Sequence, residues 1–303
     1  MRRGIGRPVF RVSSQTDIFF WTLLMSPPAA SAFTRVRPLR WKIFWLLCGL
    51  AWTGMAPAGL WAQGGPPLLT DDPGTPGNRN WEINLACTQN FTHDQHTYET
   101  PILDLNYGLG DRIQLKYQIP YLLVSNDGGP LASGMGNSLA GVKWRFYQDE
   151  AKGWNVSTYP QLELNNPGAS LRRGLVDKAP NFLLPIEVTK RVGSFELNWE
   201  AGYWFSRHLA DGRVLGFAAG HQTTKRLELL TEVYDFVEVG TKARDDTFDF
   251  GGRFEFHHDI LLLFMAGRGF SGPPSEQSRF IGYFGVQFQI NRTHHNPDPE
   301  VLP

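Results

Sequence analysis

The chain has 303 residues, of which 42% are hydrophobic and 19% charged, and its 29 Lys and Arg balance its 29 Asp and Glu. Zero net charge argues against a nucleic-acid-binding protein, because such proteins usually carry a basic excess. A mean hydropathy of −0.28 argues against a bundle of membrane-spanning helices. With 32 Gly and 21 Phe, the composition is typical of a β-rich protein with many turns.

The first part of the chain carries a targeting signal. Basic residues at positions 37–42 precede an apolar stretch, Ile43 to Leu50, and small residues follow as far as Ala62. This succession is typical of a secretory signal peptide. We therefore predict an N-terminal extension and a cleaved signal peptide over residues 1–62, with cleavage after Ala58 or Ala62. A retained membrane anchor is the alternative.

Beyond residue 62, apolar and polar residues alternate with a period of two. In the segment 195–206, Phe195, Leu197 and Trp199 alternate with Glu196, Asn198 and Glu200. A period of two places each set on one face of an extended strand. The pattern is equally clear in 112–123, 248–257 and 279–290, and weaker in 81–91, 102–109, 139–147, 155–164, 182–191, 214–223, 227–239 and 260–267. The sequence thus predicts about twelve strands of roughly ten residues, the length that a tilted membrane strand needs.

The composition of the two faces indicates which of them meets lipid. The apolar face carries large aromatic residues near the strand ends, such as Trp81, Phe91 and Phe205, as in the aromatic girdles of membrane barrels. We predict an all-β fold, an antiparallel up-and-down transmembrane β-barrel over residues 81–290, in the outer membrane of a Gram-negative-type bacterium. A soluble periplasmic β-protein with an apolar interior is the alternative.

The opposite face is charged and is predicted to line the lumen. Its candidate lining residues are Arg112, Lys116, Lys143, Arg145, Glu187, Glu196, Glu200, Glu228, Glu232, Arg253, Glu255 and Arg279. Residues 63–80 are expected to form a periplasmic N-terminal segment or a plug, in which Asp71 and Asp72 could fold inward. A solvated turn ahead of Pro73 is the other interpretation. Residues 291–303 form a polar C-terminal tail.

Three stretches resemble a known family. They are Gly65 to Asn84 (GPPLLTDDPGTPGNRNWEIN), Tyr107 to Arg112 followed by Pro120-Tyr121, and Gly134 to Asn137 followed by Gly141 to Phe146. They are similar to outer-membrane proteins of the MetA-pathway of phenol degradation family, although Asn137 replaces the usual Asp. The resemblance implies an outer-membrane barrel that transports small, often hydrophobic, compounds.

The sequence offers no persuasive catalytic constellation. Gly136 to Gly141 misses the G-x-S-x-G pattern by one residue, and no Ser and His are brought together by spacing. We therefore expect no enzyme, no cofactor and no metal site. The predicted function is passive passage of small solutes, with outer-membrane lipid, a small-molecule solute and the barrel-assembly machinery as partners and no nucleic acid. A structural or adhesive barrel with a sealed lumen is the alternative, and an outer-membrane lipid hydrolase is a further one.

Overall fold

The computed structural model describes residues 65–127, 129–166, 169–241, 243–274 and 276–291. The predicted signal peptide, and the tail beyond residue 291, lie outside the described residues. Within the described ranges, no helix is long and apolar enough to cross a membrane.

The described chain folds into β-strands joined by turns and loops. The strands are β1 (Trp81–Phe91), β2 (Gln95–Leu109), β3 (Ile113–Asn126), β4 (Ala132–Met135), β5 (Ser138–Asp149), β6 (Trp154–Thr158), β7 (Gln161–Leu164), β8 (Asn181–Val192), β9 (Phe195–Ser206), β10 (Gly212–Gln222), β11 (Leu227–Glu238), β12 (Arg244–His257), β13 (Ile260–Gly269) and β14 (Phe280–Ile290).

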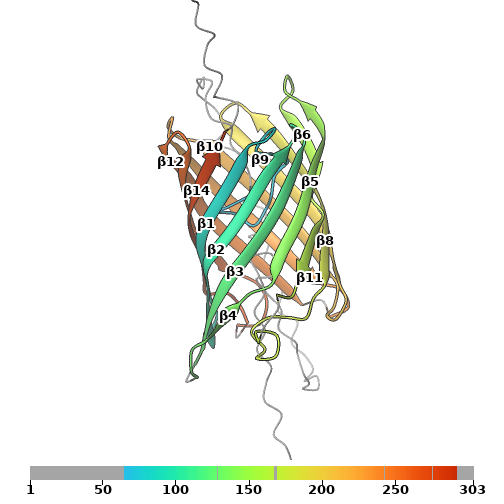
Figure 1. Ribbon diagram of the computed structural model, residues 1–303, viewed down its shortest axis with the longest axis vertical. Coiled ribbons are helices and arrows are strands. Elements are labelled where there is room, and N and C mark those ends of the chain that lie inside the picture. The colour runs from blue at the N-terminus through green and yellow to red at the C-terminus, as the bar shows by residue number, and fades with distance from the viewer. Residues whose placement is uncertain (1–64, 128, 167–168, 242, 275, 292–303) are drawn as a thin grey trace, which may run out of the picture.

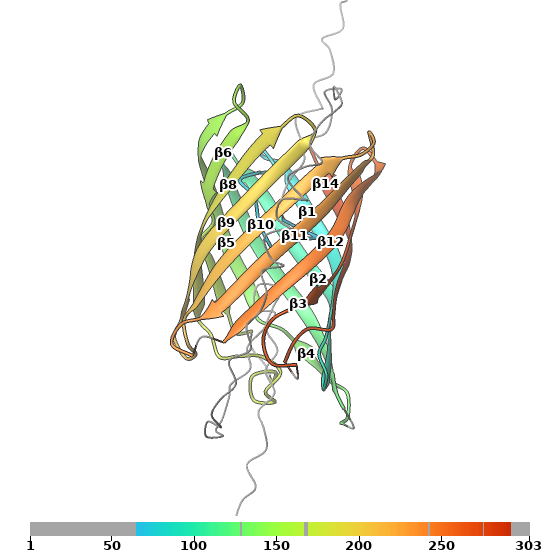
Figure 2. The ribbon, with the colours of Figure 1, turned by 180° about the vertical axis from the view of Figure 1, so that it is seen from behind.

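These strands form one closed antiparallel barrel (Figures 1 and 2). β1 pairs with β14 in continuous register from Trp81–Ile290 to Phe91–Phe280, and this pairing closes the sheet. β6 and β7 together fill one position between β5 and β8, and β4 pairs only with the end of β3. The wall therefore has 12 strands, and the predicted fold class is confirmed.

The two ends of the barrel differ in the length of their connections. Where β1 begins and β14 ends, neighbouring strands are joined by two to four residues. The other end carries β4 and the longer connections 165–180 and 270–279, and it points down in Figure 1. Because bacterial outer-membrane barrels have short periplasmic turns and longer outer loops, we assign the short-turn end to the periplasm.

Side chains alternate between an apolar outer face and an inner face that carries the charges. On β8, Phe182, Leu184 and Ile186 are exposed, whereas Glu187 and Thr189 are buried inside the barrel. A closed barrel satisfies its backbone hydrogen bonds without a free edge, so only the outer face must be apolar in lipid.

Aromatic rings pair on the outer face near both ends of the barrel. Trp81 and Tyr107 lie 4.8 Å apart, centroid to centroid, at the short-turn end. Phe91 and Phe280 lie 5.5 Å apart at the long-loop end. Rings at these two levels suit the two boundaries between lipid and water.

The interior also contains apolar clusters that the alternation did not predict. Near the long-loop end, Leu122 and Val124 of β3 pack against Leu175 and Val176 of the connection 165–180. A second cluster joins Leu183, Trp204 and Val214 of three successive strands, with Tyr234 and Phe236 packed against it. The outer half of the lumen is therefore partly apolar.

Two details of the strands differ from the prediction. Several strands are longer than expected, and β2 reaches 15 residues. The predicted strand 155–164 is interrupted at Tyr159 and Pro160. Proline has no N–H to donate to a neighbouring strand, and the ring of Tyr159 is fully buried in the interior over Gly141.

Candidate functional site: the lumen and its inner segment

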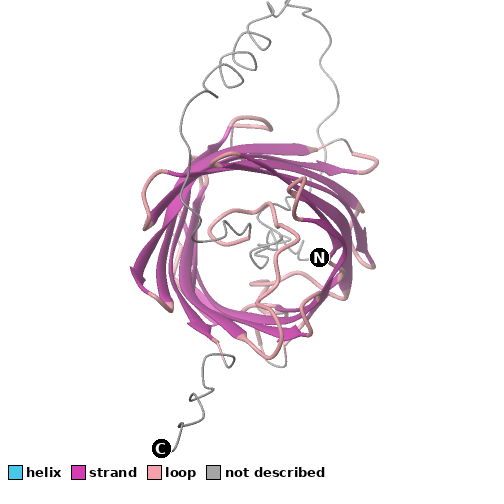
Figure 3. Cartoon of the chain, turned by 90° about the horizontal axis from the view of Figure 1, so that it is seen from above, coloured by secondary structure: helices cyan, strands magenta, loops and turns pink. Residues whose placement is uncertain are grey.

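Part of the barrel interior is occupied by the described residues that directly precede β1. We call the described residues 65–80 the inner segment. Figure 3, which looks along the barrel, shows loop segments inside the ring of strands. The inner segment accounts for part of them, because its residues bond to side chains of β5, β9, β11 and β12.

Two glutamates of the wall bind the backbone of the inner segment. The carboxylate of Glu232 accepts hydrogen bonds from the N–H of Leu69, at 2.9 Å, and from the N–H of Thr70. Glu200 accepts one from the N–H of Asp71, also at 2.9 Å. Three consecutive N–H groups of the segment are thus bonded to carboxylate oxygens of the wall, so these contacts fix the middle of the segment.

On the opposite wall, Lys143 of β5 binds the two aspartates of the inner segment. Its Nζ lies 2.6 Å from Asp71 Oδ1 and 3.8 Å from Asp72 Oδ1, and it also donates to the backbone carbonyl of Asp72. Glu187 lies 3.9 Å away, and the ring of Tyr159 lies 4.6 Å from the ammonium. The side chain of Lys143 is only 2% exposed. Removal of the Lys143 ammonium would leave these carboxylates without their cation, and breaking a buried ion pair in this way is strongly destabilising.

A third attachment is made by Arg253 of β12. Its guanidinium donates to the carbonyl of Gly65 at 3.1 Å and to that of Pro66 at 2.9 Å, and it pairs with Glu228 at 3.4 Å. Arg253 thereby holds the start of the inner segment against the wall.

Apolar packing and a close approach complete the docking. Leu68 is 7% exposed and packs in a cluster with Ile102, Leu230 and Leu263, among others. Thr70 lies directly against Gly216 of β10, where a Cβ would come within 2.3 Å of its Oγ1. The wall is therefore shaped to receive this segment.

The end of the inner segment is anchored at the short-turn end. The N–H of Arg79 donates to the carbonyl of Gly108 at 2.8 Å, and the N–H of Gly108 donates to that of Asn80 at 3.0 Å. A Cβ at position 108 would overlap the backbone of Gly77. The segment thus enters the barrel from the periplasmic side.

The structure brings most of the predicted lining residues together in the interior. Buried or nearly buried on the inner face are Lys116, Lys143, Glu187, Glu196, Glu200, Glu228, Glu232 and Arg253. Arg145 is half-buried, and Glu255 lies at the short-turn end, 3.6 Å from His258. Arg112 and Arg279 are exposed at opposite ends, each just before its strand begins, so they do not join this group.

Sequence reasoning missed a polar network at the long-loop end. Glu163, fully buried, accepts hydrogen bonds from Asn137 at 2.7 Å and from Asn181 at 2.6 Å. Asn137 also donates to the carbonyl of Asp177 and accepts from Asn165. This network holds the connection 165–180. The replacement of the family's usual Asp by Asn137 was the only sequence feature that pointed to this network. An amide can donate a hydrogen bond to Glu163, whereas an ionised carboxylate cannot.

Polar cavities remain between the inner segment and the wall. One, of about 190 Å³, is bounded by residues 72–75 and by β5, β6, β8 and β9. Another, of about 20 Å³, lies against β1, β2 and β3 and is lined by Glu82, Asp104 and Lys116, among others. These cavities lie beside the inner segment, which occupies part of the described interior.

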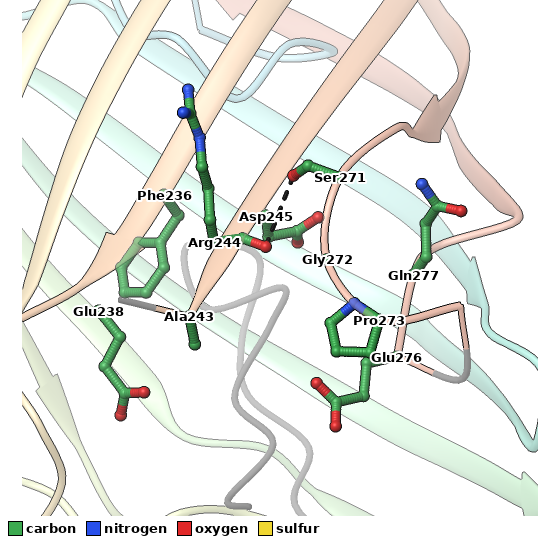
Figure 4. Close-up of a pocket in the computed structure, with 10 residues that line it drawn as sticks. All are labelled: Phe236, Glu238, Ala243, Arg244, Asp245, Ser271, Gly272, Pro273, Glu276 and Gln277. Atoms are coloured by element: carbon green, nitrogen blue, oxygen red, sulfur yellow. Dashed lines mark hydrogen bonds between the residues drawn. The ribbon is translucent and has the colours of Figure 1, made fainter. Parts of the chain in front are cut away.

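A separate pocket of about 50 Å³ lies at the long-loop end between the β11–β12 and β13–β14 connections (Figure 4). Arg244 is among its lining residues, and its guanidinium pairs with Asp235 at 2.9 Å and Asp246 at 2.7 Å. Ser271 Oγ donates to the backbone carbonyl of Arg244, as the dashed line in Figure 4 marks. These contacts join the start of β12 to β11 and to the β13–β14 connection, and none of them involves the inner segment.

One serine and histidine do meet, although their spacing did not predict it. Ser194 Oγ lies 3.2 Å from His221 Nδ1 at the short-turn end, and the imidazole stacks on Phe195. No carboxylate orients this histidine among the described residues. The described chain also contains no group of three or more His, Cys, Asp or Glu residues arranged to hold a metal ion.

Comparisons with known proteins bear on the fold. No family model matches the chain, and none of the curated proteins matches it. Among solved structures, an outer membrane channel from Pseudomonas putida F1 is 13% identical, with a TM-score of 0.58 over 75% of this chain and 100% of that chain. A KdgM porin is also 13% identical, with a TM-score of 0.50 over 68% and 98%.

Both likenesses show the fold, that of an outer-membrane β-barrel. Together with the closed wall and its apolar outer face, they confirm the predicted location in the outer membrane.

Proposed function

We propose that the chain is an outer-membrane channel through which small solutes, including hydrophobic or aromatic ones, diffuse down their gradient. The observation that carries the proposal is the attachment of the inner segment. Its middle is held in the lumen by side chains of the wall, through hydrogen bonds, ion pairs and one leucine. Such contacts can be broken and remade, so the segment acts as a plug that limits passage.

The character of the solute follows from the lining. The outer half of the lumen carries Trp204, Leu183 and Val214, while the inner half is charged. Apolar walls with a few polar groups favour small molecules that are themselves partly apolar. The resemblance of residues 65–84 to the MetA-pathway of phenol degradation family supports the same class of solute. A porin and a channel among the structural neighbours support the channel role alone. Lipid, the solute and the barrel-assembly machinery are the partners that this role requires.

A sealed structural barrel is the second candidate, and the bonding of the inner segment to several strands inside the lumen favours it. Deletion of residues 65–76 distinguishes the two. The variant keeps the predicted cleavage sites and the anchor at residues 77–80. Planar-bilayer current and solute influx into liposomes would be measured for the wild type, for this variant, and for a control that lacks residues 292–303.

For a channel, we expect a small current in the wild type, a larger one in the 65–76 deletion, and no change in the control. If neither the wild type nor the deletion passes current or solute, while both keep heat-dependent gel mobility as intact barrels, the lumen is sealed and the channel proposal is wrong. Lipid hydrolysis by the refolded protein tests the enzymatic alternative, for which Ser194 and His221 are the residues to replace.

A further inference from the structure

The lipid-facing surface of the barrel carries very few cations. On the described strands, the outward side chains include only four Lys or Arg residues, which are Lys190, Arg213, Arg244 and Arg268. Arg213 shares its face of β10 with the exposed Leu215, and Arg268 shares its face of β13 with the exposed Phe264. A charged side chain within the hydrocarbon is costly, so these few positions call for an explanation.

Three of the four cations lie together. Arg213 is the second residue of β10, Arg244 is the first of β12 and Arg268 is the last but one of β13, so all three are at the long-loop end. Arg213 and Arg244 are both in register with Val237 of β11, which places their Cα atoms two strand spacings, about 10 Å, apart. Figure 2 shows β10, β11 and β12 side by side. The arginines therefore occupy one arc of the barrel, formed by β10–β13.

Two of these three arginines are not neutralised by the protein. Arg244 pairs with Asp235 at 2.9 Å and with Asp246 at 2.7 Å. Arg213 and Arg268 form no ion pair with any residue that the structure describes. Both side chains are exposed, so their guanidinium groups are accessible from the lipid side.

The other charged groups near this surface are already engaged. Asp211, two residues before Arg213, accepts hydrogen bonds from the hydroxyl of Tyr203 at 3.1 Å and from the N–H of Ser206 at 2.9 Å. Lys190, at the short-turn end, donates to the backbone carbonyl of Lys152, and its ammonium lies 4.8 Å from the ring centroid of Trp154. Arg213 and Arg268 thus differ from every other lipid-facing cation on the described strands.

The position and the charge of the arc indicate which molecule binds there. The outer leaflet of a Gram-negative-type outer membrane is built of lipopolysaccharide, whose lipid A headgroup carries phosphates. An arginine can lay its apolar stem along the lipid-facing wall and place its guanidinium at the boundary of the membrane. Guanidinium groups bind phosphate oxygens through two parallel N–H···O bonds. Phosphates at this level would supply the anions that the protein does not provide.

We propose that Arg213 and Arg268 bind the phosphates of lipopolysaccharide on the arc formed by β10–β13. The site lies on the outer wall, at the end that carries the long loops. It goes beyond the proposed channel role, because it requires neither an open lumen nor movement of the inner segment.

Binding of lipid A to the detergent-solubilised full mature chain tests the site without any measurement of flux. Fluorescently labelled lipid A that carries both phosphates is the probe, and dephosphorylated lipid A and phosphatidylglycerol are the comparison lipids. We expect saturable binding of the probe and much weaker binding of both comparison lipids. A basic side chain beside an anionic lipid surface contributes about fivefold to affinity. We therefore expect Arg213→Gln combined with Arg268→Gln to bind the probe about 25-fold more weakly.

Lys190→Gln, which removes the lipid-facing cation at the other end, is the matched control and should bind like the wild type. Heat-dependent gel mobility shows whether each variant is an intact barrel. If the double variant does not fold, the two single variants give the same test, each with a loss of about fivefold.

The proposal is overturned if the wild type shows no saturable binding of lipid A, or if the arginine variants bind it as the wild type does. Equal binding of dephosphorylated lipid A would mean that the acyl chains alone are held, and equal binding of phosphatidylglycerol that any anionic lipid suffices. Displacement of the probe by an equal concentration of inorganic phosphate would mean that the free anion is the ligand. Each of these three results also contradicts the proposal. A barrel that conducts nothing would leave all these outcomes unchanged.

Discussion

The ammonium of Lys143 lies 2.6 Å from the carboxylate of Asp71, and this ion pair joins the inner segment to the barrel wall. Glu200 and Glu232 accept hydrogen bonds from consecutive N–H groups of the segment, so the chain is bonded to β5, β9 and β11 at once. The arrangement bonds side chains of three strands to successive residues of the segment. It thereby fixes both the position of the segment and the direction in which its N–H groups point.

Replacement of Lys143 by Met should release the inner segment. Asp72 and Glu187 would remain buried, and Asp71 partly buried, without this cation, and breaking a buried ion pair in this way costs about 3–5 kcal/mol. We expect a larger single-channel current and faster solute influx than in the wild type. Lys152→Met removes a lysine whose side chain is 75% exposed and should change neither. Unchanged current in Lys143→Met would show that this ion pair does not hold the segment.

Gly216→Ala should displace the same segment by a different route. The added Cβ would lie 2.3 Å from Thr70 Oγ1 and 3.1 Å from Thr70 Cβ, and overpacking of this kind costs about 1–3 kcal/mol. The expected result is again increased current. Thr70→Gly, introduced together with Gly216→Ala, removes the clashing atoms and should restore the wild-type current, because the bond to Glu232 comes from the backbone.

Ala219→Val, on the outward face of the same strand, controls for a general effect of added volume on β10. The close approach of Thr70 does not hold the segment in place if Ala219→Val raises the current as much as Gly216→Ala does. The same conclusion follows if the current of the double variant, Gly216→Ala with Thr70→Gly, stays above that of the wild type.

The wall of the barrel could be predicted from the sequence because two environments impose a period of two on every strand. Lipid requires an apolar side chain outward at Phe248 and Phe250, and the lumen accepts Asp249 between them. The same rule says nothing of height along the barrel axis. Arg112 and Arg279 were therefore included with the lining residues, although β3 begins at Ile113 and β14 at Phe280.

The attachments of the inner segment could not be predicted, because they join residues far apart in the chain. Thr70 and Glu232 are separated by 162 positions. Asp71 and Asp72 were recognisable as acids that could fold inward, but their partner Lys143 was one of several inward cations. Spacing alone does not indicate which of these lies at the level of the segment. Tyr159 and Glu163 were missed because their roles depend on such contacts.

Asn137→Asp should destabilise the long-loop end. The amide now donates to Glu163 at 2.7 Å, whereas an aspartate would place two buried carboxylates side by side. Loss of a hydrogen bond to a charged group costs about 1.5–3 kcal/mol, and the repulsion adds to it. Urea unfolding of the barrel in lipid vesicles measures this cost. Glu163→Gln in the same chain supplies a donor for the new carboxylate and should recover most of the lost stability. Failure of that rescue would mean that Asn137 acts through another contact.

Phe284→Arg tests whether the apolar face meets hydrocarbon. Phe284 lies near the middle of β14 on the outer face and is 58% exposed. An arginine at the bilayer midplane costs about 2–4 kcal/mol, falling to about 0–1 kcal/mol near the interfaces. Ile290→Arg, on the same face at the end of the same strand, is the matched control. Unfolding in vesicles should show a large loss of stability for Phe284→Arg and little for Ile290→Arg. Equal losses would contradict the depth assigned to β14, because the two substitutions differ chiefly in their distance from the bilayer midplane.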